Sequence, residues 1–219
     1  MIMREVNLLD AYPRIKRPIR ERESAVALAR EVAKRFGREY FDGDRTQGYG
    51  GYRYDGRWVP VARGMAEFYG LKSGERILDV GCAKGFLLHD FLQILPGVHV
   101  AGVDISEYAI EHAMDSVKPF IRVASADTLP FADKSFDLVV SINTVHNLEL
   151  ERCKRAIREI ERVSRKYKYI QVDSWLSEEQ HRNLERWQLT ALTYLDPEGW
   201  KRLFAEAGYT GDYYWTITE

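Results

Sequence analysis

Past residue 70, short runs of apolar residues alternate with longer segments in which apolar residues recur at helical spacing. The short runs are apolar throughout, which is typical of parallel strands covered by helices on both faces. This alternation predicts an α/β fold with three layers, in which a mostly parallel sheet of six or seven strands lies between helices. The predicted strands lie at about Arg76–Val80, His99–Asp104, Phe120–Ala124, Phe136–Ile142, Tyr167–Asp173 and Asp212–Thr218.

Helices are expected between these strands, and local signals mark several of their ends. Ser177 and Gln180 form a capping box at the start of one helix. Asp196 followed by Pro197 supplies an N-cap and a first-turn proline for another helix, which Gly208 ends. The expected helices lie at about Gly85–Leu95, Glu107–Ser116, Glu149–Arg165, Glu178–Trp187 and Pro197–Ala207.

The first 58 residues do not follow this alternation. We therefore predict two parts, a helical extension over residues 1–58 and a core domain over residues 59–219. A basic stretch, Ala11–Glu23, is either a solvated face or a surface for an anionic acceptor. Glu21–Tyr40 is expected to form an amphipathic helix that places on one side Val26, Ala29, Ala33 and Phe36.

The segment Phe41–Trp58 contains five glycines, three tyrosines and a tryptophan. This composition is too flexible for a regular element and too aromatic for an inert linker. It predicts either a surface loop whose rings pack on the core or a lid over a ligand site. As a lid, it would present the hydroxyl of Tyr49 or Tyr52 to the reactants.

Composition narrows the choice of partners. The chain has 219 residues, of which 45% are hydrophobic, and can bury one substantial core. A net charge of −1 gives no general attraction to nucleic acid, so we expect no nucleic-acid partner. No apolar run approaches the roughly 20 residues that span a bilayer, and the first residues lack a signal-peptide core, which predicts a cytoplasmic protein without a membrane partner. Cys82 and Cys153 are expected to be free thiols.

Candidate chemistry begins in Ile77–Phe86, which has the sequence ILDVGCAKGF. It predicts a buried strand, a glycine-bearing turn and the start of a helix. Gly81 and Gly85 would let the backbone approach a ligand closely. The next predicted strand ends in Asp104, 19 residues after Gly85, which suits a carboxylate that accepts both hydroxyls of a ribose.

The glycine spacing does not fit the dinucleotide fingerprint G-x-G-x-x-G. It resembles the first motif of the class I S-adenosylmethionine-dependent methyltransferases, D-x-G-x-G-x-G, with Ala83 in place of the middle glycine. The resemblance continues through Ala126 and Asp127 and spans roughly Val59 to Ser174. It implies a Rossmann-like fold and S-adenosylmethionine as cofactor. The family sheet normally has seven strands, the last two antiparallel, so either this sheet has six strands or Trp187–Leu195 supplies another.

Matching the family motifs residue by residue implies the cofactor site. The turn residues Gly81, Ala83 and Gly85 are expected to line the methionine and ribose portions. Asp79 is expected to anchor the turn, and Ala126 belongs to the matching motif after the third strand. The remaining expected contacts are Asp104 with the ribose hydroxyls, Ile105 with the adenine face, Asp127 with the adenine amino group and Asn143 with the methionine end.

The reaction that the resemblance implies is an in-line displacement at the methyl group, for which alignment of the reactants supplies most of the catalysis. His146 is the first candidate for a general base, because it follows the fourth predicted strand at the edge where open parallel sheets bind ligands. The alternative is a structural histidine. Asp173, at the end of the fifth strand, is a second candidate for the base.

Absent motifs narrow the acceptor. The sequence after the fourth strand is Asn143-Thr144-Val145-His146, which lacks both the Pro-Pro tetrad of DNA-amine methyltransferases and a magnesium-holding aspartate. Glu149 and Glu151 are too close together for a protein-arginine enzyme. These features favour methylation of an O, N or C atom of a small molecule, such as a sugar, a nucleotide-linked sugar or an amino metabolite, without a metal. A nicotinamide-dependent oxidoreductase and a non-catalytic regulatory module are the alternatives, and homodimer formation is left open.

Overall fold

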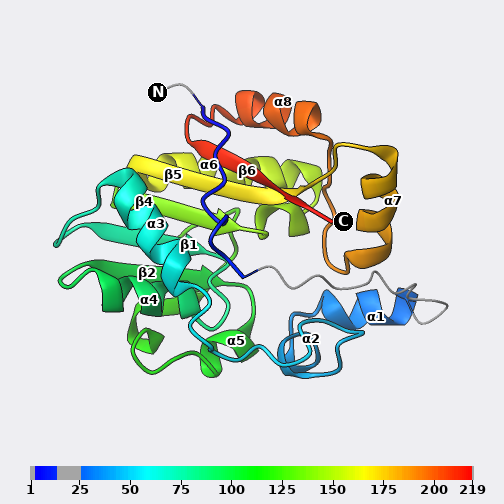
Figure 1. Cartoon of the computed structure of the whole chain (residues 1–219), viewed down its shortest axis with the longest axis horizontal. Helices are drawn as coiled ribbons and strands as arrows, with labels where there is room; N and C mark the ends of the chain where they lie inside the picture. Colours follow the sequence, from blue (N-terminus) through cyan, green and yellow to red (C-terminus); the bar gives the residue numbers. More distant parts are fainter. Residues whose placement is uncertain (1–2, 14–25, 219) are drawn as a thin grey trace.

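The computed structural model describes residues 3–13 and 26–218 and centres on one six-stranded sheet (Figure 1). The strand order is β3-β2-β1-β4-β5-β6, and every neighbouring pair is parallel. The order reverses between β1 and β4, which is where sheets of this kind bind ligands. The strands are β1 (Arg76–Val80), β2 (His99–Asp104), β3 (Ile121–Val123), β4 (Phe136–Ile142), β5 (Ser164–Ser174) and β6 (Asp212–Ile217).

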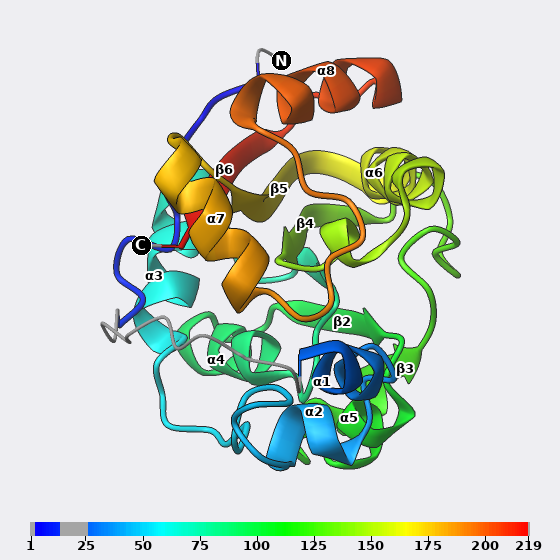
Figure 2. The same ribbon diagram turned by 90° about the vertical axis from the view of Figure 1, so that its right-hand side faces the viewer.

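Helices cover both faces of the sheet and its carboxyl edge. Figure 2, which looks onto the carboxyl ends of the strands, shows α7 beside β6 and the pair α1–α2 beside α5. The helices are α1 (Val26–Ala33), α2 (Arg38–Asp42), α3 (Val59–Tyr69), α4 (Phe86–Ile94), α5 (Glu107–Glu111), α6 (Leu150–Val163), α7 (Glu178–Trp187) and α8 (Pro197–Ala207). Two short 3-10 turns, η1 (Lys118–Phe120) and η2 (Val145–Asn147), complete the described structure.

The core has two halves, one on each face of the sheet. Along β1, Ile77 packs with the residues of α3 and α4, whereas the next residue, Leu78, packs with those of α6 and α8. Val139 and Val140 of β4 divide in the same way. Successive side chains of a strand point to opposite faces, so burial of both faces requires the uninterrupted apolar runs seen in the sequence.

All six predicted strands and the predicted α/β architecture are confirmed. The expected caps also form: the side chain of Ser177 accepts a hydrogen bond from the Gln180 amide, and that of Asp196 accepts one from the Gly199 amide. The antiparallel pair implied by the resemblance is absent, because β6 pairs with β5 in parallel. The stretch between α7 and α8 forms no strand.

Two predicted helices are shorter than expected. The described part of Glu21–Tyr40 divides into α1 and α2, because Phe36 has a left-handed φ of +48° and its carbonyl accepts a hydrogen bond from the Ser106 hydroxyl at 2.5 Å. Helix α5 ends at Glu111, since the Met114 amide donates to the Lys84 carbonyl instead of continuing the helix. The start of the first helix and most of the basic stretch Ala11–Glu23 lie outside the described residues.

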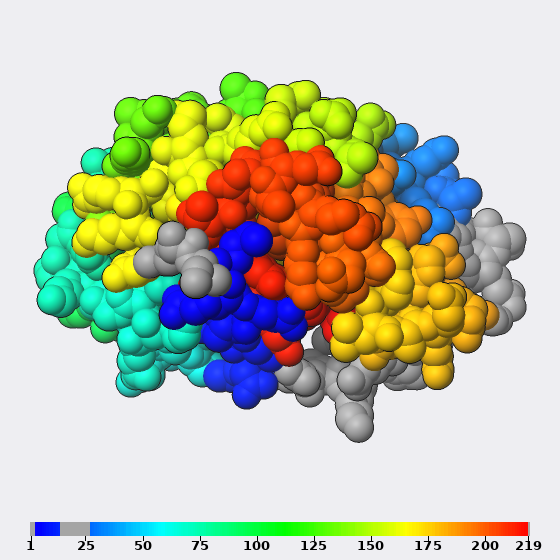
Figure 3. Space-filling view, turned by 90° about the horizontal axis from the view of Figure 1, so that it is seen from above, coloured from blue at the N-terminus to red at the C-terminus, as the bar shows by residue number. Residues whose placement is uncertain are grey.

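The N-terminal segment, residues 3–12, pairs with the outer edge of β6 at Glu5 and then crosses the sheet toward α3 (Figures 1 and 3, blue). The Val6 amide donates to the Tyr213 carbonyl, and the Tyr213 amide donates to the Arg4 carbonyl, both at 3.0 Å. The Arg4 guanidinium also binds both oxygens of the buried Asp212 carboxylate at 2.7 and 2.8 Å. Within the described ranges, no helix is long and apolar enough to cross a membrane.

Two glycine substitutions test the packing of the sheet. A Cβ atom at Gly102 would lie 2.7 Å from the Cys82 sulfur and 2.8 Å from a methyl of Leu88, so Gly102→Ala should lower the free energy of unfolding by about 1 to 3 kcal/mol. Gly64→Ala is the matched control, because a Cβ at this position of α3 would meet nothing within 4 Å. It should raise the free energy of unfolding by about 0.5 to 1 kcal/mol. Urea denaturation measures both, and equal effects would contradict this account of β2.

Candidate active site

The turn after β1 has a backbone that only particular residues can adopt. Gly81 has a φ of +88°, and a Cβ atom there would lie 2.0 Å from the Thr144 hydroxyl oxygen. Gly85 has a φ of +77°, and a Cβ would lie 2.5 Å from a methyl of Val117. Both glycines are therefore required by close contacts as well as by backbone conformation.

Ala83 stands where the family motif has its middle glycine. It has a left-handed φ of +48°, a conformation that an L-residue with a Cβ adopts at a cost of about 1 kcal/mol. The Ala83 amide donates a hydrogen bond of 2.8 Å to the carboxylate of Asp104, which holds this backbone in place. Alanine is tolerated at this position because the hydrogen bond offsets the strain.

Asp104 lies at the carboxyl end of β2, as predicted. One carboxylate oxygen accepts from the Ala83 amide, and the other accepts from the Ser106 amide at 2.9 Å. Burial raises the pKa of this carboxyl, while the backbone hydrogen bonds act against that rise. Each oxygen has a second lone pair, so the carboxylate can still accept two hydroxyl hydrogens. The neighbouring Ile105 side chain is 53% exposed and offers an apolar surface.

Asp79 is the second carboxylate of the site. It is buried, and its burial together with the charge of Asp104 raises its pKa to about 7. Two neighbouring carboxylates in a dry site repel each other and attract a cation. The predicted anchoring residue therefore also makes this part of the site suitable for a positively charged ligand group.

The predicted adenine contact, Asp127, is already engaged. Its carboxylate accepts hydrogen bonds from the Ser125 hydroxyl at 2.5 Å, from Arg152 at 2.8 and 3.1 Å, and from Arg155 at 3.1 Å. The hydrogen bonds from Arg152 are the main reason that the pKa of Asp127 is lowered. A carboxylate has about four lone-pair positions, so these four bonds leave none for an adenine amino group unless an arginine moves. The assignment of Asp127 to adenine stays a prediction.

Asn143 and Ala126 lie at the same edge of the sheet. Asn143 has a left-handed φ of +51°, its amide donates to the Gln171 carbonyl at 2.8 Å, and its side-chain oxygen accepts from the Thr216 hydroxyl at 2.8 Å. These bonds join the ends of β4, β5 and β6. Ala126 packs against the core on the α6 face of the sheet. Their contacts with a cofactor stay predictions.

His146 lies in η2 and contacts Asp173 with both ring nitrogens. Its Nδ1 accepts a hydrogen bond from the Asp173 amide at 3.0 Å, so the neutral ring carries its hydrogen on Nε2, which lies 3.7 Å from the Asp173 carboxylate. Burial lowers the pKa of His146. The ring has no free acceptor nitrogen in this arrangement, which supports the structural alternative over the general base.

The loop Phe41–Trp58 packs some of its aromatic rings on one another and on the start of α4. Tyr52 stacks on Phe86 at 4.7 Å between ring centroids, and the rings of Tyr49 and Tyr52 lie 4.5 Å apart. Burial raises the pKa of Tyr52, and the charges of Asp79 and Asp104 add to that rise, which places the Tyr52 hydroxyl near both carboxylates. A tyrosine with a raised pKa is a poor base and a suitable hydrogen-bond donor.

A buried ion pair joins this loop to the turn after β1. The ammonium group of Lys84, a residue of the turn itself, lies 2.5 Å from the Asp42 carboxylate and 3.1 Å from the Tyr52 carbonyl. The Tyr108 hydroxyl also donates to Asp42, at 2.7 Å. Although burial of Asp42 acts in the opposite direction, hydrogen bonds from Lys84 and Tyr108 lower the pKa of its carboxyl. Sequence patterns did not indicate this contact, since Asp42, the last residue of α2, precedes Lys84 by 42 residues.

Known proteins are similar to this chain. A sequence profile described as "Methyltransferase domain" matches residues 78–170. This match confirms the resemblance to the class I S-adenosylmethionine-dependent methyltransferases that the sequence predicts, and with it S-adenosylmethionine as the methyl donor of this family. A methyltransferase is therefore the enzyme class that residues 78–170 match.

The names of individual relatives refer to different methyl acceptors. A tRNA (carboxymethyluridine(34)-5-O)-methyltransferase of Arabidopsis thaliana is 29% identical over 79% of this chain and 41% of its own length. A demethylmenaquinone methyltransferase of Tropheryma whipplei is 31% identical over 54% of this chain and 48% of its own. The chain thus spans about half the length of these relatives. The crystal structure of an S-adenosylmethionine-dependent methyltransferase from Methanosarcina mazei superposes with a TM-score of 0.55 and 20% identity, covering 65% of this chain and 82% of the other, which shows a shared fold.

Because Asp104 is expected to bind the ribose hydroxyls, its substitution should lower the affinity for the cofactor. Asp104→Ala should weaken binding of S-adenosylhomocysteine by about 1.5 to 3 kcal/mol, or roughly 10- to 150-fold, because a charged acceptor for two hydroxyls is lost. Calorimetric titration of the folded variant measures the dissociation constant. Asp115→Ala, at an exposed position between α5 and η1, is the control and should bind like the wild type. A dissociation constant that is unchanged in Asp104→Ala would remove the ribose assignment.

The raised pKa of Asp79 predicts a pH-dependent stability. The folded protein holds the Asp79 proton more tightly than the unfolded chain does, so ionisation of this group destabilises the ligand-free fold as pH rises from the usual carboxyl pKa of 3.8 to about 7. Asp79→Asn removes this charge. The melting temperature of the variant relative to wild type should therefore be higher at about pH 8 than at about pH 5. The same difference at both pH values would show that Asp79 has an ordinary pKa.

Proposed function

We propose that this protein transfers the methyl group of S-adenosylmethionine to an O, N or C atom of a small-molecule acceptor. One observation carries the proposal. Asp104, with two lone pairs still available, lies beside Asp79 and beneath an aromatic loop that reaches the turn through Lys84. The residues present fit the cofactor, because the carboxylate suits its ribose and the pair of carboxylates suits its positive charge.

The bound cofactor supplies a methyl group that is already activated by the positively charged sulfur. The chain's own residues then align the reactants and exclude water, which can contribute roughly 7 to 11 kcal/mol to lowering the barrier. Gly81, Ala83 and Gly85 bring backbone close to the ligand. The loop that carries Tyr49 and Tyr52 covers the site, and its rings replace water around a charged group.

Among the predicted general bases, Asp173 is better supported than His146. The Asp173 carboxylate keeps acceptor positions, and burial raises its pKa, with the charge of His146 acting against that rise. A carboxylate with a raised pKa holds an abstracted proton more readily. Asp173 ends β5 at the carboxyl edge of the sheet, the same edge at which Asp104 ends β2. We propose that His146 orients Asp173 rather than accepting the proton itself.

A small acceptor is favoured by the size of the cavity. A cavity of 280 Å³ lies between the loop and the start of α4, a volume near the lower limit for small-ligand pockets. A transfer RNA is the second candidate, since a relative that is 29% identical carries a tRNA methyltransferase name. The net charge of −1 disfavours it, because binding along a phosphate backbone usually requires an excess of basic residues.

A labelling experiment tests the proposed function and separates the acceptors. The full chain is incubated with S-adenosylmethionine carrying a tritiated methyl group, either with a metabolite extract cleared of macromolecules or with total tRNA. We expect labelled product in the metabolite reaction, little label in tRNA, and loss of labelling in Asp104→Ala but not in Asp115→Ala. Label in tRNA alone would replace the small-molecule proposal. Absence of label in both reactions, with cofactor binding intact, would favour a regulatory module.

A further inference from the structure

The cavity beneath the loop lies next to the cofactor turn, because Phe86 immediately follows Gly85. Three parts of the chain far apart in sequence form its walls: the N-terminal segment, the loop and the start of α4. Tyr12 reaches it at the end of the segment that Arg4 fixes to β6. The lining residues are Tyr12, Arg45, Tyr49, Gly50, Gly51, Tyr52, Arg53, Arg57, Trp58 and Phe86.

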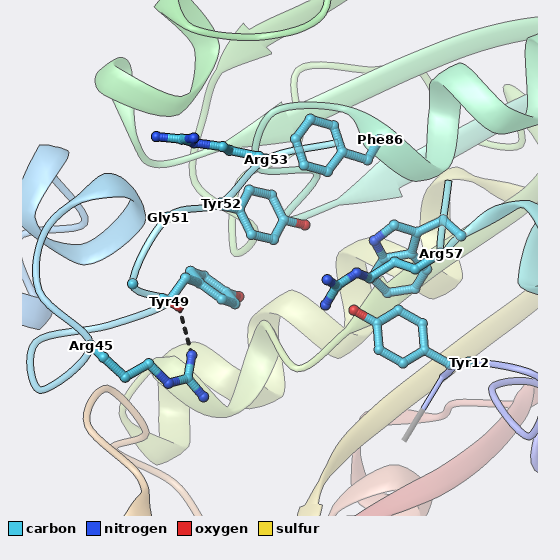
Figure 4. Close-up of a pocket in the computed structure, with 10 residues that line it drawn as sticks. Tyr12, Arg45, Tyr49, Gly51, Tyr52, Arg53, Arg57 and Phe86 are labelled. Carbon is cyan, nitrogen blue, oxygen red and sulfur yellow. Dashed lines mark hydrogen bonds between the residues drawn. The ribbon is translucent and has the colours of Figure 1, made fainter. Parts of the chain in front are cut away.

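Cationic and neutral donors dominate this lining. The Arg57 guanidinium extends into the space between Tyr12, Tyr49 and Tyr52, and the hydroxyls of Tyr12 and Tyr52 point toward it (Figure 4). Arg57 pairs on one side with Asp55, which lies outside the cavity, and its guanidinium carbon lies 5.9 Å from the centroid of the Tyr12 ring. Among the described residues that line the cavity, none carries a carboxylate.

A second observation identifies a missing acceptor atom. The indole nitrogen of Trp58 is buried and has no hydrogen-bond partner of normal geometry, although the Tyr52 hydroxyl lies close enough for the indole N–H to lower its pKa. A buried donor without an acceptor destabilises the fold, so such groups are usually satisfied by a ligand or a water. An oxygen placed between Trp58 and Arg57 would satisfy this donor.

We propose that the cavity binds an anionic group, a carboxylate or phosphate, on the methyl acceptor. This inference rests on the proposed function. Arg57 pairs with the anion, the Trp58 indole N–H donates to one of its oxygens, and the rings of Tyr12 and Tyr52 contact the planar part of the molecule. The opposite charge lies across the site, where Asp79 and Asp104 favour the cationic end of the cofactor. The cofactor and the methyl acceptor would thus bind at neighbouring sites that favour opposite charges.

The indole N–H of Trp58 supplies a direct measurement. The chain has five tryptophans, so a ¹H–¹⁵N correlation spectrum of the full chain resolves the indole groups, and Trp58→Phe assigns the signal. Phenyl phosphate is the probe, with phenol as the neutral match and benzylamine as the cationic match. We expect phenyl phosphate to move the Trp58 signal downfield with saturation, and the other two compounds to leave it in place at the same concentration.

Substitution of Arg57 tests the charge. Arg57→Met should raise the dissociation constant of phenyl phosphate about tenfold or more, whereas Arg63→Met, on the exposed side of α3, should change it less than twofold. Thermal unfolding verifies that both variants fold. Arg57→Lys keeps the positive charge but loses the planar guanidinium that can donate two hydrogen bonds to one anion, so its dissociation constant should lie between those of the wild type and Arg57→Met. Equal binding of phenol and phenyl phosphate would overturn the proposal.

The cofactor carries a carboxylate of its own, and a competition experiment separates the two sources of anion. We expect phenyl phosphate and S-adenosylhomocysteine to bind together, each with a dissociation constant changed less than twofold by the other. Displacement of the probe by S-adenosylhomocysteine, with the same Trp58 shift, would assign the cavity to the cofactor's carboxylate and overturn the inference while leaving methyl transfer intact. Failure of methyl transfer, with the probe still bound, would instead count against the proposed function alone.

Discussion

The carboxylate of Asp104 holds two backbone amides, and the geometry of the site depends on this pair of hydrogen bonds. One amide belongs to Ala83, whose left-handed backbone would be unfavourable without that bond, and the other belongs to Ser106. The Ser106 hydroxyl in turn caps α5 and donates to the Phe36 carbonyl. A single side chain at the end of β2 therefore sets the cofactor turn, the start of the next helix and the bend that directs the overlying loop.

Charged side chains are distributed unevenly around Asp104. The floor of the site contains Asp79 and Asp104, whereas the wall under the loop contains Arg57 and the unpaired indole of Trp58. Lys84 stands between the two regions, and its ammonium group is neutralised by Asp42. Each region is therefore expected to favour a ligand group of the opposite charge. We propose that this division of charge orients the positively charged methyl donor.

Sequence patterns predicted the sheet well because strands that are buried on both faces have uninterrupted apolar runs in the sequence. The six strands, the capping residues of α7 and α8 and the turn from Gly81 to Gly85 all follow from local composition. The features that the sequence did not reveal depend on contacts between distant segments. His146 is engaged by the backbone of Asp173, Asp127 by two arginines of α6, and α5 ends early because Met114 bonds to the cofactor turn. In each case the two partners are far apart in the sequence, so no local sequence pattern could predict the contact.

The N-terminal segment has a consequence for how copies of this protein could meet. Its backbone hydrogen bonds to Tyr213 occupy the start of the outer edge of β6, where a neighbouring chain would otherwise add a strand. The opposite edge is β3, only three residues long, and such short edges resist strand addition. These two features disfavour growth of the sheet across molecules, so we expect an association between copies to use side-chain surfaces on the helices rather than a shared sheet.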